Sequence, residues 1–153
     1  MKIEMIFFAA AMSIFAVCCS GKRPSNIGLN KGMLAECPGS PNCVSSQSKD
    51  KAHYIDPIVY QGSREEAVDK IVSVIKSEKR TNIIVQEKDY IHAEFTSLIF
   101  RFVDDVEFYF NDEKKIIHIR SASRLGYSDM GANRKRIEGI REKFNKKKDL
   151  AEK

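Results

Sequence analysis

The segment Ile119–Arg136 carries more polar groups than a connection between a strand and a helix needs. Such a connection requires a glycine and a capping residue, here Gly126 and Asp129, yet arginines, serines and an asparagine accompany them. Guanidinium, hydroxyl and amide groups bind phosphates and carboxylates, as do the amides at the start of a helix. The pattern therefore predicts a site for a small anion or an anionic lipid headgroup, formed by Arg120, Ser121, Ser123, Arg124, Ser128, Asn133 and Arg134.

The same segment also fits a purely structural role. Asp129 stands where its carboxylate can accept the free amides at the start of the helix, and it would repel an anionic ligand. Polar side chains of these types can also bind one another and fix a strand to a helix. The residues alone leave both interpretations open, an anion site and a structural junction.

A second polar group comes from the strands expected at 82–87, 90–100, 103–110 and 115–123. A two-residue turn at Asp112-Glu113 would set Glu107 opposite His118 and Asp105 opposite Arg120. That pairing would leave Arg124 as the arginine available to a ligand. Because side chains alternate between the two faces of a sheet, we expect one open face that carries His92, Glu94, Asp105, Glu107, His118 and Arg120.

These histidines and carboxylates have the chemistry of general acid–base groups or metal ligands. The sequence nevertheless contains no H-E-x-x-H, G-x-S-x-G or phosphate-binding loop. Ser121 and Ser123 have no base at a recognisable spacing, and no catalytic residue can be assigned. We therefore expect a non-catalytic binding or structural module without a cofactor or a bound metal. The alternatives are an enzyme or metal-binding protein that uses the open sheet face, and an envelope protein that docks a protein partner.

The elements that position these residues follow from capping and periodicity. Ser63 and Glu66 form a capping box that opens a helix ending near Lys79. A short edge strand is expected within 54–60, and a last helix from about Asp129 to Lys148. The predicted fold class is α+β: a helix, a four-stranded antiparallel β-meander and a C-terminal helix, with both helices packed on one sheet face.

The first residues have the pattern of an export signal. Ile6–Val17 is an apolar run that is short for a membrane-spanning helix, and it ends at Cys18 and Cys19. This arrangement resembles a bacterial lipobox, in which the first mature cysteine carries the lipid anchor. The expected organisation is a lipoprotein-type signal peptide over 1–18, cleaved before Cys18 or Cys19, a flexible tether over 19–36, one domain over 37–148 and a polar tail over 149–153.

An exported protein, anchored in a membrane of the cell envelope, meets little nucleic acid. The net charge of +5 arises mainly from the C-terminal helix, and a basic helix of this kind attracts anionic lipid. We therefore expect the membrane itself as a partner, held through the lipid anchor, together with an anionic lipid or small anion. We expect no nucleic acid, and the sequence identifies no protein partner.

Cys37 and Cys43 lie in the short segment CPGSPNC. Outside the cytoplasm, a disulfide is the expected state of such a pair. Two thiols fill half of the four positions of a zinc site, and the spacing is not C-x-x-C. A metal site or a redox pair is therefore a less favoured alternative to the disulfide.

Two segments resemble a known family. They are CPGSPNCVSSQ at Cys37–Gln47, and DDVEF followed by IRSASRLGYSDMGANRKRIEGIR within Asp104–Arg141. Both are similar to the domain of unknown function family 1499 (DUF1499), over nearly the whole predicted domain from about Cys37 to Phe144. The resemblance implies no activity, because the family is named for having none assigned.

Overall fold

A computed structural model describes residues 21–151 of the chain, with side chains to residue 146, so the predicted signal peptide, Cys18 and Cys19 lie outside the described residues. The elements in chain order are β1 (Cys43–Ser45), β2 (Ile58–Val59), α2 (Arg64–Ser77), β3 (Thr81–Gln86), β4 (Tyr90–Thr96), β5 (Val103–Asn111), β6 (Ile116–Ser123) and α3 (Ala132–Ala151). No helix in this described part of the chain is long and apolar enough to span a bilayer.

The strands form one antiparallel sheet in the order β1-β6-β5-β4-β3, with β2 also paired to β6. Strands β3 to β6 are the predicted meander. The two additional strands share one edge, because β1 pairs with the end of β6 around Ser121 and β2 pairs with its beginning around Ile117. The predicted edge strand within 54–60 is therefore present as β2, whereas β1 was not predicted.

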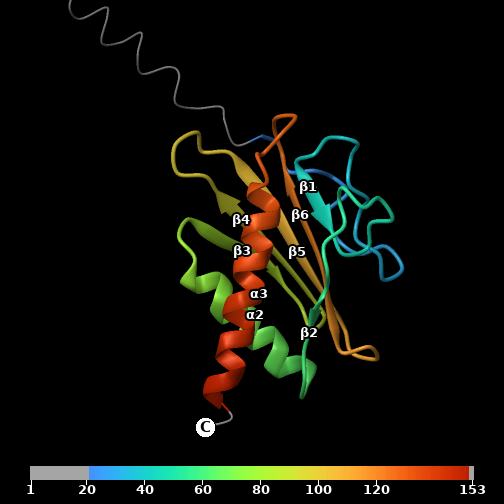
Figure 1. Cartoon of the computed structure of the whole chain (residues 1–153), viewed down its shortest axis with the longest axis vertical. Helices are drawn as coiled ribbons and strands as arrows, with labels where there is room; N and C mark the ends of the chain where they lie inside the picture. Colours follow the sequence, from blue (N-terminus) through green and yellow to red (C-terminus); the bar gives the residue numbers. More distant parts are fainter. Residues whose placement is uncertain (1–20, 152–153) are drawn as a thin grey trace, which may run out of the picture.

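Both helices cover the apolar face of the sheet. Helix α2 begins at the predicted capping box, in which Ser63 accepts from the Glu66 amide and Glu66 accepts from the Ser63 amide. Apolar side chains of α2, α3, β4, β5 and β6 form one buried cluster, which includes Ile71, Phe108 and Ile140. Figure 1 shows α3 running along the sheet with α2 beside it. The α+β fold class is confirmed, with six strands in place of four.

The predicted pairing of the β5–β6 hairpin is wrong by two residues. The connection is the four-residue turn 112–115 between the paired Asn111 and Ile116, so Glu107 lies opposite Arg120, and Asp105 lies opposite Ala122. A two-residue hairpin turn of type I′ needs positive φ at both central positions, which Asp-Glu does not favour. A shift of two residues keeps each side chain on its predicted face and changes only its partner.

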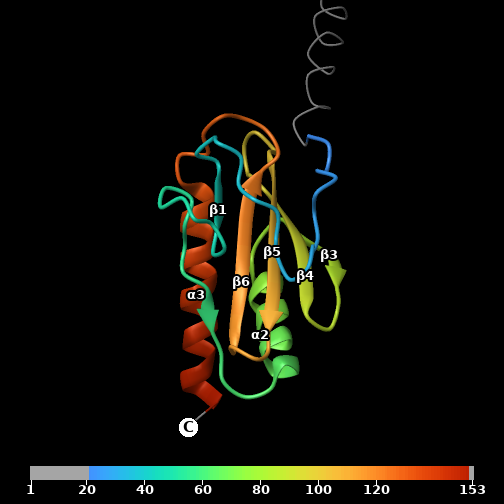
Figure 2. The same cartoon turned by 90° about the vertical axis from the view of Figure 1, so that its right-hand side faces the viewer.

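The second difference concerns the predicted flexible tether. Residues 21–36, which we call the covering segment, lie along the sheet on the side away from α3 (Figure 2). The Leu34 side chain is buried, and its amide donates to the Gln47 side chain at 2.8 Å. The polar face is consequently not open, since His92, Asp105, Glu107 and Arg120 are all buried.

Candidate functional site

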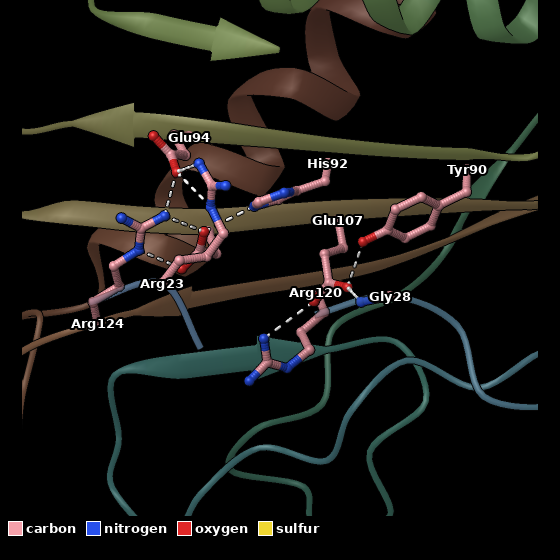
Figure 3. Close-up of polar contacts among 9 residues, drawn as sticks. Arg23, Gly28, Tyr90, His92, Glu94, Glu107, Arg120 and Arg124 are labelled. Carbon is pink, nitrogen blue, oxygen red and sulfur yellow. Dashed lines mark hydrogen bonds and ion pairs between the residues drawn. The ribbon is translucent and has the colours of Figure 1, made fainter. Parts of the chain in front are cut away.

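The polar face of β4, β5 and β6 holds two groups of ionisable residues, drawn in Figure 3. The first group surrounds Asp105 and Glu94, whose side chains point to the same arginine. Arg124 binds Asp105 through two parallel hydrogen bonds, Nε to Oδ2 at 2.8 Å and Nη2 to Oδ1 at 2.7 Å, and Nη2 also donates to Glu94. His92 Nε2 lies 2.8 Å from Asp105 Oδ1.

The covering segment completes this first group. Arg23 donates to Glu94 Oε1 through Nε at 3.0 Å and through Nη2 at 2.6 Å. Glu94 therefore lies between Arg23, which comes from the covering segment, and Arg124, which comes from the residue after β6. The arginine that the sequence left available to a ligand is in fact bound to two carboxylates.

The second group surrounds Glu107, which is fully buried. Its Oε1 accepts from the Tyr90 hydroxyl at 2.7 Å and from the Gly28 amide at 2.8 Å, while Oε2 accepts from Arg120 Nη1 at 3.2 Å. The Gly28 bond is again a contact from the covering segment. Arg120 keeps one buried nitrogen, Nε, without a partner.

Electrostatics favour the ionised state of both carboxylates in the first group. Burial raises the pKa of Asp105, but the hydrogen bonds from Arg124 and His92 outweigh it, so the pKa falls below its usual value. Glu94 follows the same balance, with Arg23 and Arg124 as the opposing donors. Burial and the neighbouring Glu107 raise the pKa of the Tyr90 hydroxyl, which stays protonated and donates. A carboxylate held ionised by fixed donors is suited to structure, since a general acid or base needs a pKa near the working pH.

His118 does not join either group. Its Nδ1 lies 3.2 Å from the Ser46 hydroxyl, and its ring stacks on Tyr109 with the centroids 6.0 Å apart. Burial lowers its pKa, with a smaller contribution from the charge of Lys114. Within the described residues, no three His, Cys, Asp or Glu side chains are arranged to hold a metal ion. The alternative of a metal site on this face has no ligand set in this part of the chain.

The strand–helix junction is connected through Asn133. Its side-chain Nδ2 donates to the Asn42 carbonyl at 3.0 Å, to Ser123 Oγ at 3.0 Å and to Asp129 Oδ2 at 2.8 Å. Its Oδ1 accepts from the Ser121 hydroxyl. Asn133 thereby joins β6, α3 and the loop before β1 while being buried itself.

The start of α3 is occupied by a side chain of the protein. Asp129 Oδ1 accepts from the Gly131 amide at 2.9 Å, and Oδ2 accepts from the Asn133 amide at 2.7 Å. The Met130 amide donates to Ser128 Oγ at 3.2 Å. The amides that an anion would use are therefore bound to Ser128 and Asp129, as the structural interpretation of the sequence requires.

Two arginines of α3 bind neighbouring elements. Arg134 donates to the carbonyls of Tyr54 and Ala52 at 2.8 and 2.9 Å. Arg136, which was not among the predicted site residues, donates to Asp104 at 2.5 Å and to Asn133 Oδ1 at 2.7 Å. Four further residues of these contacts were not predicted: Arg23, Gly28, Asn42 and Tyr90. Of these, only Asn42 had a signal, its place in the CPGSPNC segment.

The disulfide is confirmed. Cys37 and Cys43 are bonded, with their Cα atoms 5.6 Å apart. A cavity of about 370 Å³ lies beside it, lined in part by Leu34, Gln47 and His53. His53 offers no free nitrogen to this cavity, because Nδ1 lies 2.9 Å from Asp50 and Nε2 lies 3.1 Å from the Ser40 carbonyl.

Comparison with known proteins gives one match. The family model described as "Protein of unknown function (DUF1499)" matches residues 33–144. No curated protein and no solved structure matches the chain. The matched range begins inside the covering segment and includes both ionisable groups and the junction.

Proposed function

The chain belongs to the DUF1499 family of proteins of unknown function, and we propose that it is a lipid-anchored, non-catalytic domain of the cell envelope. In this proposal, Cys18 or Cys19 carries the anchor. The ionisable residues of the sheet face and the polar residues of the junction stabilise the domain and its covering segment.

One observation carries the non-catalytic part of the proposal. The covering segment closes the polar face with contacts to both ionisable groups, through Arg23 to Glu94 and through the Gly28 amide to Glu107. A substrate would have to displace these contacts to reach Asp105, which is 1% exposed. The buried carboxylates Asp105 and Glu107 each already accept two or more hydrogen bonds, so their negative charges are already compensated within the fold.

We assign a structural role to the strand–helix junction as well, because its polar groups are also bound to other groups of the protein. Arg124 is bound to two carboxylates, Arg134 to two carbonyls, and Asp129 occupies the start of α3. An anion at this place would have to compete with a carboxylate that is covalently part of the site. In this proposal, anionic lipid is attracted by the net charge of the chain, +5, and not bound in a specific pocket at the junction.

Membrane fractionation tests the anchor. The full chain and a Cys18→Ala/Cys19→Ala variant would be expressed in a bacterial host, with the single variants identifying the lipidated cysteine. We expect the full chain in the membrane fraction, resistant to high salt, and a larger soluble share for the double variant. Recovery of the full chain in the soluble fraction, with the native fold, would refute the lipid anchor.

A further inference from the structure

Two neighbouring loops expose large apolar side chains at one end of the domain. The loop between β4 and β5 presents Leu98, Ile99 and Phe100, which are 67%, 78% and 65% exposed. The loop between β6 and α3 presents Leu125, Tyr127 and Met130, also exposed. Adjacent exposed apolar side chains mark a surface that contacts another molecule or a membrane. We call these six residues the apolar end.

The backbone holds the two loops together. The first loop is closed at its base, because the Ser97 amide donates to the Phe102 carbonyl at 2.8 Å and the Phe102 amide donates to Ser97 Oγ at 2.9 Å. The Arg124 amide donates to the Val103 carbonyl at 3.1 Å, which fixes the base of the second loop beside the first. The two loops that carry the exposed side chains are therefore joined at their bases by backbone hydrogen bonds.

The described chain begins at this same end. Figures 1 and 2 both show the start of the blue segment beside the yellow and orange loops. Gly21 is packed so closely that an added Cβ would lie 2.9 Å from Arg124 Cβ and 3.0 Å from Leu125 Cγ. Its φ of +64° also favours glycine. Gly21, the first described residue, is thus packed against the loop between β6 and α3.

This position limits how far the domain can stand from a lipid anchor. A flexible tether from Cys19 to Cys37 would reach about 60 Å when extended. With the covering segment bound to the sheet, only the link from Cys19 to Gly21 remains, and it spans at most about 7 Å. A lipid on Cys18 would lengthen this reach by about one residue. The apolar end therefore lies within reach of the lipid headgroups.

We propose that the apolar end inserts into the interfacial layer of the bilayer that holds the anchor, so that the domain is oriented on the membrane and does not hang from it. This inference rests on the proposed lipid anchor for its geometry. The occupant of the apolar end is a lipid bilayer, because the link to the anchor is too short to let a folded protein fit between the end and the headgroups. Lys22, which follows Gly21, and Arg101, which follows Phe100, are both exposed, and their positive charges match the phosphates of that layer.

Tryptophan fluorescence gives a direct test, because the chain contains no tryptophan. Ile99→Trp places the probe at the apolar end. Val59→Trp is the matched control: Val59 is 68% exposed and belongs to β2, which lies at the opposite end of the domain (Figure 1). Each variant of the full lipidated chain would be reconstituted in phosphatidylcholine–phosphatidylglycerol vesicles that contain lipids brominated near the headgroup end of the acyl chains.

We expect the emission of Ile99→Trp to shift to the blue and to be quenched by the brominated lipids at least about twofold, since an inserted indole leaves water. Val59→Trp should keep the emission of an exposed indole. If vesicle-bound Ile99→Trp is no more quenched than Val59→Trp, the apolar end does not enter the bilayer and the inference is overturned.

A second measurement separates this inference from the anchor. The Cys18→Ala/Cys19→Ala chain would be mixed with the same vesicles, with and without Leu98→Ser, Ile99→Ser and Phe100→Ser. We expect the three serines to lower the vesicle partition coefficient at least about tenfold, because several large apolar side chains no longer leave water. Equal partitioning of the two folded chains would overturn the insertion. Soluble recovery of the wild-type chain after fractionation would instead refute the anchor.

Discussion

Removal of the Arg124 guanidinium is the sharpest perturbation of the polar sheet face. Arg124→Met keeps the length and most of the apolar stem of the side chain but leaves Asp105 without its bidentate partner. Arg124 is 7% exposed and Asp105 is 1% exposed, so water cannot replace the lost hydrogen bonds. Breaking a buried ion pair by removing one partner costs about 3–5 kcal/mol. We expect about 3 kcal/mol, because His92 and Arg23 still contact the two carboxylates.

The assay is equilibrium unfolding in urea at pH 7, on a chain that carries Cys18→Ala and Cys19→Ala to keep it free of lipid. Arg124→Lys should fall between wild type and Arg124→Met, since an ammonium keeps the charge but cannot make two parallel bonds. Lys146→Ala is the control. It breaks the Lys146–Glu142 pair, whose side chains are 70% and 66% exposed, and should leave the free energy of unfolding nearly unchanged.

The result that refutes the reasoning is a loss below about 1 kcal/mol for Arg124→Met with an unchanged dependence on urea. Such a value would mean that the ion pairs contribute little net stability. The polar residues of this face would then need another explanation, and a ligand would become the first candidate.

Two further predictions concern pH and the disulfide. Asp105 and Glu94 have lowered pKa values in the folded state, so their contribution is present above the ordinary values of 3.8 and 4.5 and is lost as the pH falls through the folded pKa values. The lowered pKa of His118 adds a loss below its ordinary value of 6.5. The free energy of unfolding should therefore fall from about pH 6.5 downwards, most steeply below about pH 4.5, and a rise in acid would contradict the assignment. Replacement of Cys37 and Cys43 by serine should cost about 2 kcal/mol in urea unfolding, because the bond closes a short loop, and no change would show that it adds no constraint.

The faces of the sheet were predictable because alternation depends only on each strand's own sequence. Phe108, Ile117 and Ile119 lie in the core as expected, and Asp105, Glu107 and Arg120 lie on the opposite face. The pairs across the hairpin were not predictable in the same way. They depend on the length of the turn, and a turn longer by two residues moved Arg120 from Asp105 to Glu107.

The covering segment was missed for a different physical reason. It has no apolar periodicity, and its contacts use one arginine, one backbone amide and one buried leucine. A backbone amide such as that of Gly28 leaves no mark in the sequence, because nearly every residue has one. Composition therefore favoured a flexible tether where the fold provides a fixed cover.

Amide hydrogen exchange at Gly28, followed by nuclear magnetic resonance on the lipid-free chain, tests most directly whether the covering segment is part of the fold. The Gly28 amide, which belongs to the covering segment, donates to the buried Glu107 side chain at 2.8 Å. We expect exchange at least about a hundredfold slower than in an unstructured chain, because exchange then requires an opening of the domain. Exchange at the rate of an unstructured chain would show that residues 21–36 are a tether after all, with the polar sheet face open and the apolar end free of any fixed distance from the membrane.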